Sequence, residues 1–130
     1  MWWNDYVGLK FKEKGRDRSG VDCWGLVCLI YKDLKGIDLP SRADTYSSTK
    51  DKETIAALIE KWNHDFWVEV KEPETFDVLV LKIAGVPFHV GIYLYDRKFI
   101  HCAHGVGAVV ERLDSLRWKN NLIGAYRWAT

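Results

Sequence analysis

Cysteine and histidine are the residue types in this sequence that together can perform nucleophilic catalysis. A cysteine thiolate attacks a carbonyl carbon, while a histidine takes up the proton and returns it to the leaving group. Cys23 follows Asp22, a good helix N-cap, and precedes apolar residues at helical spacing. The sequence therefore places Cys23 in the first turn of a helix, where the helix dipole and free N–H groups favour a thiolate and can bind an oxyanion.

Another reading of Cys23 stays open, because a free cysteine is more often a small buried apolar residue. Gly25 favours the catalytic reading. Glycine inside a helix costs about 1 kcal/mol relative to alanine, which indicates that something approaches the helix closely at this point. Cys28 and Cys102 are predicted to be bystanders.

His89 and His101 are the candidate base and its orienting partner, and they fall on the two strands of a predicted hairpin. A three-residue loop at 95–97 would place Gly91 opposite His101 and make the two histidines diagonal neighbours within side-chain reach. A two-residue loop would send His101 to the other face, and His104 would become the natural partner. We predict the three-residue loop.

A metal site is the competing interpretation of His101, Cys102 and His104. Successive residues of a strand face opposite ways, and the closely spaced ligand pairs of structural zinc sites are missing from the sequence. No metal and no cofactor is therefore predicted.

The elements that must position these residues follow from periodicity and turn residues. The predicted helices cover 22–35, stopped by Gly36, and about 51–62. The predicted strands cover 77–82, 88–94, 98–103, 108–112 and 122–128. Helices followed by an antiparallel sheet of about five strands indicate the α+β class, in a single domain over residues 1–130.

Composition excludes several function classes. Nineteen basic and 18 acidic side chains give a net charge of +1, which argues against nucleic-acid binding through a basic surface. A hydrophobic content of 48% argues against disorder. No run approaches the roughly 18 apolar residues of a membrane span, so no membrane insertion is expected. Residues 1–5 lack the features of a signal peptide, so synthesis in the cytoplasm is expected.

Three segments resemble the NlpC family of papain-like cysteine peptidases: GVDCWGLV at 20–27, FHVGIYL at 88–94 and FIH at 99–101. The resemblance implies a papain-like α+β fold and hydrolysis of amide bonds in bacterial peptidoglycan stem peptides, typically the bond between D-glutamate, through its γ-carboxyl, and a diamino acid. It implies that Cys23 is the nucleophile, His89 the general base and acid, and His101 the orienter of His89.

The resemblance also suggests three substrate-binding residues. Asp22 matches a position that helps to bind the substrate's free amine, and it can serve as the helix N-cap at the same time. Trp24 replaces a serine common in the family, and we consider it a candidate wall of the substrate groove. Phe11 stands where a tyrosine is common.

Residues 8–17 and 22–26 look most like the branch of the family found in bacteriophage and prophage tails. This implies a location in the virion tail, other tail-tip proteins as partners, and action on the cell wall. Two alternatives stay open: a structural tail component that keeps the peptidase fold, and an amidase or acyltransferase acting on an amide outside the cell wall.

Overall fold

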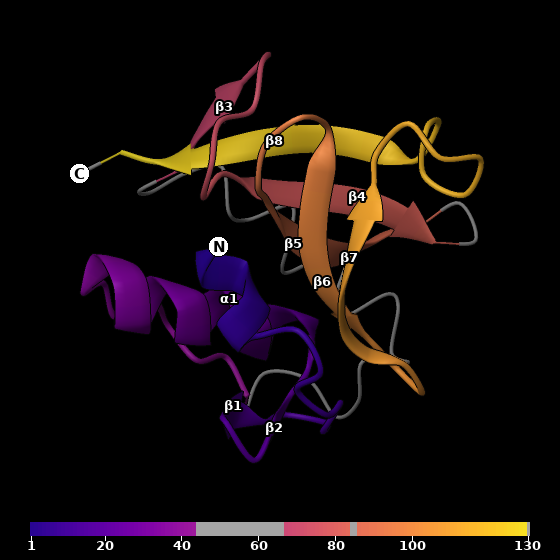
Figure 1. Cartoon of the computed structure of the whole chain (residues 1–130). Helices are drawn as coiled ribbons and strands as arrows, with labels where there is room; N and C mark the ends of the chain where they lie inside the picture. The colour runs from indigo at the N-terminus through magenta and orange to yellow at the C-terminus, as the bar shows by residue number, and fades with distance from the viewer. Residues whose placement is uncertain (44–66, 84–85, 130) are drawn as a thin grey trace.

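A six-stranded antiparallel sheet carries both candidate histidines in the computed structural model, which describes residues 1–43, 67–83 and 86–129 (Figure 1). The strand order is β3-β8-β4-β5-β6-β7. The strands are β3 (Trp67–Val70), β4 (Val78–Ile83), β5 (Val86–Tyr93), β6 (Lys98–Ala103), β7 (Gly107–Arg112) and β8 (Leu122–Trp128).

Five of these strands confirm the predicted ones, with ends that shift by one or two residues at most. The sixth, β3, corrects the expected count of about five. It is a short edge strand with exposed residues at Val68 and Glu69, so its sequence shows no clear apolar alternation. Pairing with β8 places Trp67 opposite Trp128, with ring centroids 5.1 Å apart. Tertiary pairing therefore forms a strand that local pattern does not reveal.

The predicted first helix is confirmed as α1 (Cys23–Ile30), continued by a π-helical turn, η2 (Tyr31–Lys35). Gly36 ends it with a φ of 64°, in the left-handed region that glycine adopts without steric cost. The helix predicted over 51–62 lies outside the described residues. No helix within the described ranges is long and apolar enough to cross a membrane.

The sheet separates two apolar clusters. Buried residues of α1 pack with Val90, Ile92 and Ile100 on one face. A second cluster contains Leu79, Leu81, Phe99, Leu113, Trp118 and Ala125. Because side chains alternate along a strand, His89 and His101 belong to the face of this second cluster, whereas Val90 faces α1. The rings of His89 and His101 contact Trp118 and Phe99 of this cluster.

The N-terminal segment packs beside α1 (Figure 1). It contains a 3₁₀ turn, η1 (Trp2–Asp5), and a two-stranded hairpin of β1 (Arg16–Asp17) and β2 (Gly20–Val21) that leads directly into α1. Phe11 forms an isolated parallel bridge with Val21. The β2 strand, which enters the helix, is therefore held by backbone pairing with β1 and with Phe11.

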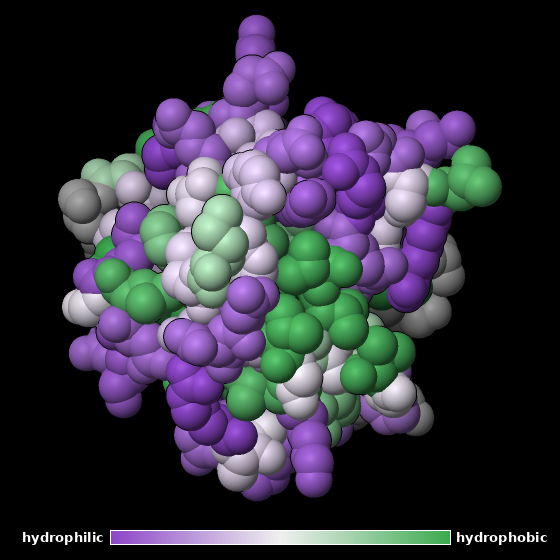
Figure 2. Space-filling model, viewed as in Figure 1, coloured by the Kyte–Doolittle hydropathy of each residue, from purple (hydrophilic) through white to green (hydrophobic). Residues whose placement is uncertain are grey.

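Hydrophilic residues cover most of the face shown in Figure 2, with a group of apolar residues near its middle. The large apolar side chains with the greatest exposure among the described residues include Met1, Val106 and Leu116. Exposed apolar residues are normal on globular proteins. The surface pattern alone therefore identifies no partner.

Candidate active site

The register between β5 and β6 confirms the predicted three-residue loop. Ile92 pairs with Ile100, and the Leu94 N–H donates to the Lys98 carbonyl at 2.8 Å. Gly91 consequently lies beside the second histidine strand: a Cβ at Gly91 would lie 2.9 Å from the Ile100 carbonyl oxygen. Only glycine fits at this position without displacing the neighbouring strand.

This register brings the two histidines together. His89 Nε2 lies 2.7 Å from His101 Nδ1, and both side chains are buried. The ladder pairs of β5 and β6 end at Ile92 and Ile100, so the imidazoles meet just beyond the last pair. A side-chain hydrogen bond therefore continues the link between the two strands where the ladder stops.

Two neighbours of the histidines were not identified from the sequence, Glu111 on β7 and Trp118. The Glu111 carboxylate hydrogen-bonds to His101 Nε2, and the Trp118 ring stacks on His89 with centroids 5.9 Å apart and planes 15° apart. Phe99 stacks on His101 at 4.8 Å. The register of the β6–β7 hairpin, which pairs Phe99 with Glu111, is the signal that would have located the carboxylate. Trp118 lies in a loop and has no such signal.

Cys23 begins α1, as predicted, but its side chain is only 8% exposed. Burial raises the pKa of the thiol to about 12, and the Asp22 carboxylate also raises it, against the opposing effect of the Val90 and Trp24 backbone N–H groups. The expectation of a stabilised thiolate is therefore wrong for this structure. Desolvation of the charged form outweighs the helix N-terminus.

The structure places the Cys23 sulfur beside the Val90 N–H, one residue from His89. Among the described residues, no hydrogen bond joins this thiol to an imidazole. The thiol therefore lies beside the strand that carries His89, without a hydrogen bond to the His89 ring.

Both imidazoles are kept neutral by their surroundings. Burial, then the neighbouring His101 and Arg117, lowers the pKa of His89 to about 3. Burial also lowers the pKa of His101, although the hydrogen bond and charge of Glu111 act in the opposite direction. At neutral pH the site therefore holds a thiol and two uncharged imidazoles.

Acid pH is expected to destabilise the fold through His89. Its folded pKa of about 3 lies below the ordinary value of 6.5, so the unfolded chain binds the proton more readily. The stabilising contribution is complete above pH 6.5 and is lost as the pH falls toward 3. Urea unfolding measured by tryptophan fluorescence at pH 7, 5.5 and 4 should show a falling midpoint. The decline should be less steep in His89→Gln, and equal slopes for both proteins would contradict this account.

Asp22 is fully buried, and both of its carboxylate oxygens accept hydrogen bonds. Oδ1 accepts from the Gly25 N–H at 2.8 Å and from Arg16 Nη1 at 2.7 Å, and Oδ2 accepts from the Lys14 N–H at 3.0 Å. The predicted N-cap is thereby confirmed. The amine-binding role stays a prediction, and an incoming amine would have to compete with these donors.

The close approach predicted at Gly25 is also confirmed. A Cβ at Gly25 would lie 2.0 Å from the Gly15 carbonyl oxygen. That same oxygen accepts from Arg16 Nη1 at 2.8 Å. The glycine therefore lets the N-terminal hairpin dock onto the first turn of α1, and the Arg16–Asp22 ion pair bridges the two parts.

Replacing Asp22 with alanine is expected to lower the free energy of unfolding by about 3 kcal/mol, because it leaves Arg16 and two N–H groups without their buried acceptor. Urea unfolding at pH 7 measures the change. Asp38→Ala, at an exposed position, should change it by less than about 0.5 kcal/mol. A loss below about 1 kcal/mol in Asp22→Ala would show that the carboxylate does not hold the helix entrance.

Trp24 and Phe11 have different environments. Trp24 is 7% exposed, and its indole N–H donates to the Pro40 carbonyl at 2.8 Å, so its described contacts are those of a core residue. Phe11 is half-buried and meets the His104 ring edge-on at 5.0 Å. Trp24 belongs to α1, whereas Phe11 belongs to the N-terminal segment. Their contact with a substrate stays a prediction.

Phe11 borders an open pocket of about 350 Å³. Its lining residues are Gly8, Leu9, Lys10, Phe11, His104, Gly105, Val106 and Gly107. The β6–β7 turn and the first residue of β7 supply half of this lining, and β6 also carries His101. Phe11, one of the three residues suggested for substrate binding, thus lines an open pocket.

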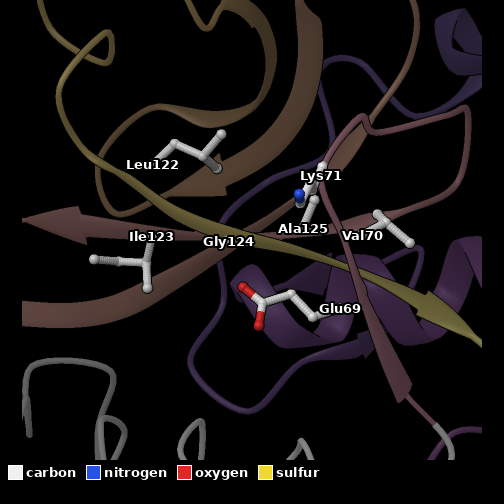
Figure 3. A pocket seen from close by; sticks show the side chains of 7 residues that line it. All are labelled: Glu69, Val70, Lys71, Leu122, Ile123, Gly124 and Ala125. Atoms are coloured by element: carbon white, nitrogen blue, oxygen red, sulfur yellow. The ribbon is translucent and has the colours of Figure 1, made fainter.

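A larger pocket, of about 500 Å³, lies between β3 and β8 (Figure 3). Glu69 and Lys71 contribute its charged side chains, and Ile123 lies on its β8 side. It contains none of the cysteines or histidines discussed above. Within the described ranges, no group of three or more His, Cys, Asp or Glu side chains is arranged to hold a metal ion.

Comparison with known proteins identifies a family that matches most of the chain. The sequence profile of the NlpC/P60 family matches residues 8–127. The chain is 23% identical over 123 residues to the murein DD-endopeptidase/LD-carboxypeptidase MepS of Escherichia coli K12, covering 95% of this chain and 57% of MepS. It is 31% identical over 128 residues to the murein DD-endopeptidase MepH of the same strain, covering 95% of this chain and 42% of MepH.

The fold matches that of a solved relative, the NlpC/P60 domain of the peptidoglycan hydrolase SagA, with a TM-score of 0.65. That match is 21% identical and covers 95% of this chain and 91% of the SagA domain. It shows the shared papain-like α+β fold. The chain spans about half the length of the two curated relatives.

Proposed function

Since this chain belongs to the NlpC/P60 family, we propose that it is a cysteine peptidase with Cys23 as the nucleophile, His89 as the general base and acid, and His101 as the orienter. The contact of 2.7 Å between His89 Nε2 and His101 Nδ1 carries this proposal. It occupies one nitrogen of His89 and leaves Nδ1 for the thiol. The residue after His89, Val90, already holds the sulfur through its backbone N–H.

The proposed reaction starts from a neutral thiol. His89 Nδ1 takes the thiol proton while the sulfur attacks the carbonyl carbon of the scissile amide, and the resulting oxyanion is bound by N–H groups at the start of α1. His89 returns the proton to the leaving amine, which departs and leaves a thioester on Cys23. Water, deprotonated by His89, then releases the acid and restores the thiol.

This reaction requires a hydrogen bond between Cys23 and His89, and none joins the two side chains within the described residues. Catalytic hydrogen bonds often tighten only when substrate is bound. The raised pKa of the thiol and the lowered pKa of His89 make an ion pair unfavourable before that moment. Proton transfer is therefore coupled to attack on the substrate.

We further propose that the substrate is the stem peptide of bacterial peptidoglycan, cut at the γ-D-glutamyl–diamino acid bond. The names of MepS and MepH, which describe murein endopeptidases, support the substrate class. A net charge of +1 suits a peptide of mixed charge. The likeness of residues 8–17 to phage and prophage tail enzymes supports delivery by a tail tip, with other tail proteins as partners.

Mass spectrometry after digestion of purified peptidoglycan and of defined stem peptides tests the proposal. The expected products carry a new free amine on the diamino acid and a free γ-carboxyl on D-glutamate. Cleavage only at the D,D cross-link would show that the enzyme cuts a different bond from the one proposed. Intact substrates after prolonged incubation would overturn the peptidase assignment.

A structural role without catalysis is the second candidate, and the 8% exposure of Cys23 favours it. Iodoacetamide labelling, followed by peptide mass spectrometry, separates the two. A non-catalytic chain should leave Cys23 unlabelled even with peptidoglycan fragments present. In a peptidase, the fraction of Cys23 that is labelled should rise in parallel with the loss of cleavage activity.

A further inference from the structure

Glu111 lies within a line of side chains that leads from the protein surface to His89. β6 and β7 pair Phe99 with Glu111 and His101 with Val109, so Glu111 is diagonal to His101 on the same face of the sheet. The Glu111 carboxylate meets His101 Nε2, and His101 Nδ1 meets His89 Nε2 at 2.7 Å. The line is continuous from Glu111 to the candidate base.

The donor and acceptor in each hydrogen bond along this line follow from the Glu111 carboxylate at its outer end. A carboxylate only accepts, so His101 Nε2 must carry a hydrogen and donate it to Glu111. The neutral His101 ring then has a lone pair on Nδ1, which can only accept from His89 Nε2–H. His89 is in turn left with its lone pair on Nδ1, the form required of a base that accepts the Cys23 proton.

We propose that Glu111 is a positioning residue that sets the tautomers of both histidines and thereby makes His89 Nδ1 the basic atom. The inference rests on the proposed function only where activity is concerned. The tautomers themselves are properties of the chain at rest. Glu111 acts on the reaction through His101 and His89 and has no contact with the reacting atoms.

Because His101 is buried, the Glu111 carboxylate is not easily replaced by water as the acceptor for its Nε2–H. His101 has no exposed surface, and its ring lies between Phe99 and Trp118 at centroid distances of 4.8 and 5.4 Å. Water therefore has little access to replace the carboxylate at Nε2. The charged and titratable groups that face His101 are His89, Glu111 and Arg117, whose guanidinium lies 3.8 Å from the Glu111 carboxylate.

Nitrogen-15 NMR of the histidine rings in the full chain tests the tautomers directly. In the wild type at pH 7, both His101 and His89 should carry hydrogen on Nε2. Glu111→Gln keeps an accepting carbonyl oxygen and should keep this signature. Glu111→Leu removes the acceptor, so the His101 signals should move toward a mixture of tautomers. Peptidoglycan cleavage by Glu111→Leu should fall on the order of 10²-fold in kcat, and glutamine should largely restore it.

Asp114→Leu is the matched control, because Asp114 is an acid in the same segment whose carboxylate pairs with Arg112 at the surface. It should leave the tautomers and the cleavage rate unchanged. An Nδ1–H tautomer of His101 in the wild type would overturn the inference, whether or not Glu111→Leu folds. So would an unchanged Nε2–H signature in a folded Glu111→Leu. Absence of cleavage by the wild type would refute the peptidase proposal alone, since the NMR signature is read without substrate.

Discussion

Cys23→Ala is expected to reduce peptidoglycan cleavage to the uncatalysed background, a loss of at least about 10⁴-fold. Alanine cannot form the thioester, and no neighbouring group in the proposed mechanism replaces the sulfur. The fold should persist, because the change removes one buried sulfur atom and costs about 1 kcal/mol. Release of soluble fragments, quantified by mass spectrometry, measures activity, and urea unfolding confirms that the variant is folded.

Cys28→Ala is the control for this experiment. Cys28 lies on the same helix, and burial likewise raises the pKa of its thiol to about 12, so it matches Cys23 in chemistry. Its sulfur faces the Pro40 carbonyl at 3.8 Å, in contrast to Cys23 beside β5. Cleavage by Cys28→Ala should remain within about threefold of wild type. Full activity in Cys23→Ala would show that Cys23 is not the nucleophile, irrespective of the activity of Cys28→Ala.

His89→Ala should lower kcat by 10²- to 10⁴-fold, the usual range for loss of a general base. The thiol has a pKa of about 12, so almost none of it ionises at pH 7 without a base beside it. The residual rate of His89→Ala should therefore rise with pH, as hydroxide takes over the removal of the thiol proton. The pH–rate profile between pH 6 and 10 measures this difference.

His101→Ala provides the graded comparison. It leaves the His89 ring in place and removes the hydrogen-bond partner of His89 Nε2, so its loss in kcat should be smaller than that of His89→Ala. Equal losses in both variants would indicate that the two imidazoles act as one unit. A smaller loss in His89→Ala than in His101→Ala would exchange the proposed roles.

Burial explains why the Cys23 thiol is not ionised at neutral pH, although it lies at a helix N-terminus. Burial keeps the thiol protonated and the imidazole neutral, so both stay uncharged until a substrate arrives. A neutral thiol and a neutral imidazole are also the more stable forms when no hydrogen bond joins them, because an isolated buried charge is costly. In the proposed mechanism, activation then depends on a hydrogen bond between Cys23 and His89.

Local signals were sufficient for a large part of this site. Asp22 before an apolar helical pattern located the N-terminus of α1, and Gly25 indicated the close approach that proved to be the Gly15 carbonyl. The loop at 95–97 was enough to place His89 and His101 on one face, because side-chain direction in a hairpin depends only on register and period. These features depend on neighbouring residues in the chain, so sequence reasoning could reach them.

The burial of side chains and the contacts between distant segments could not be predicted from such local sequence signals. The first-turn position of Cys23 predicted a thiolate, but the pKa of the thiol depends on how much protein surrounds it, and only packing against β5 determines that. Glu111 and Trp118 come near the histidines through strand pairing and loop closure rather than proximity in sequence. Sequence thus predicted which groups form the candidate site and their order along the chain, while their protonation depends on the dielectric surroundings that tertiary packing creates.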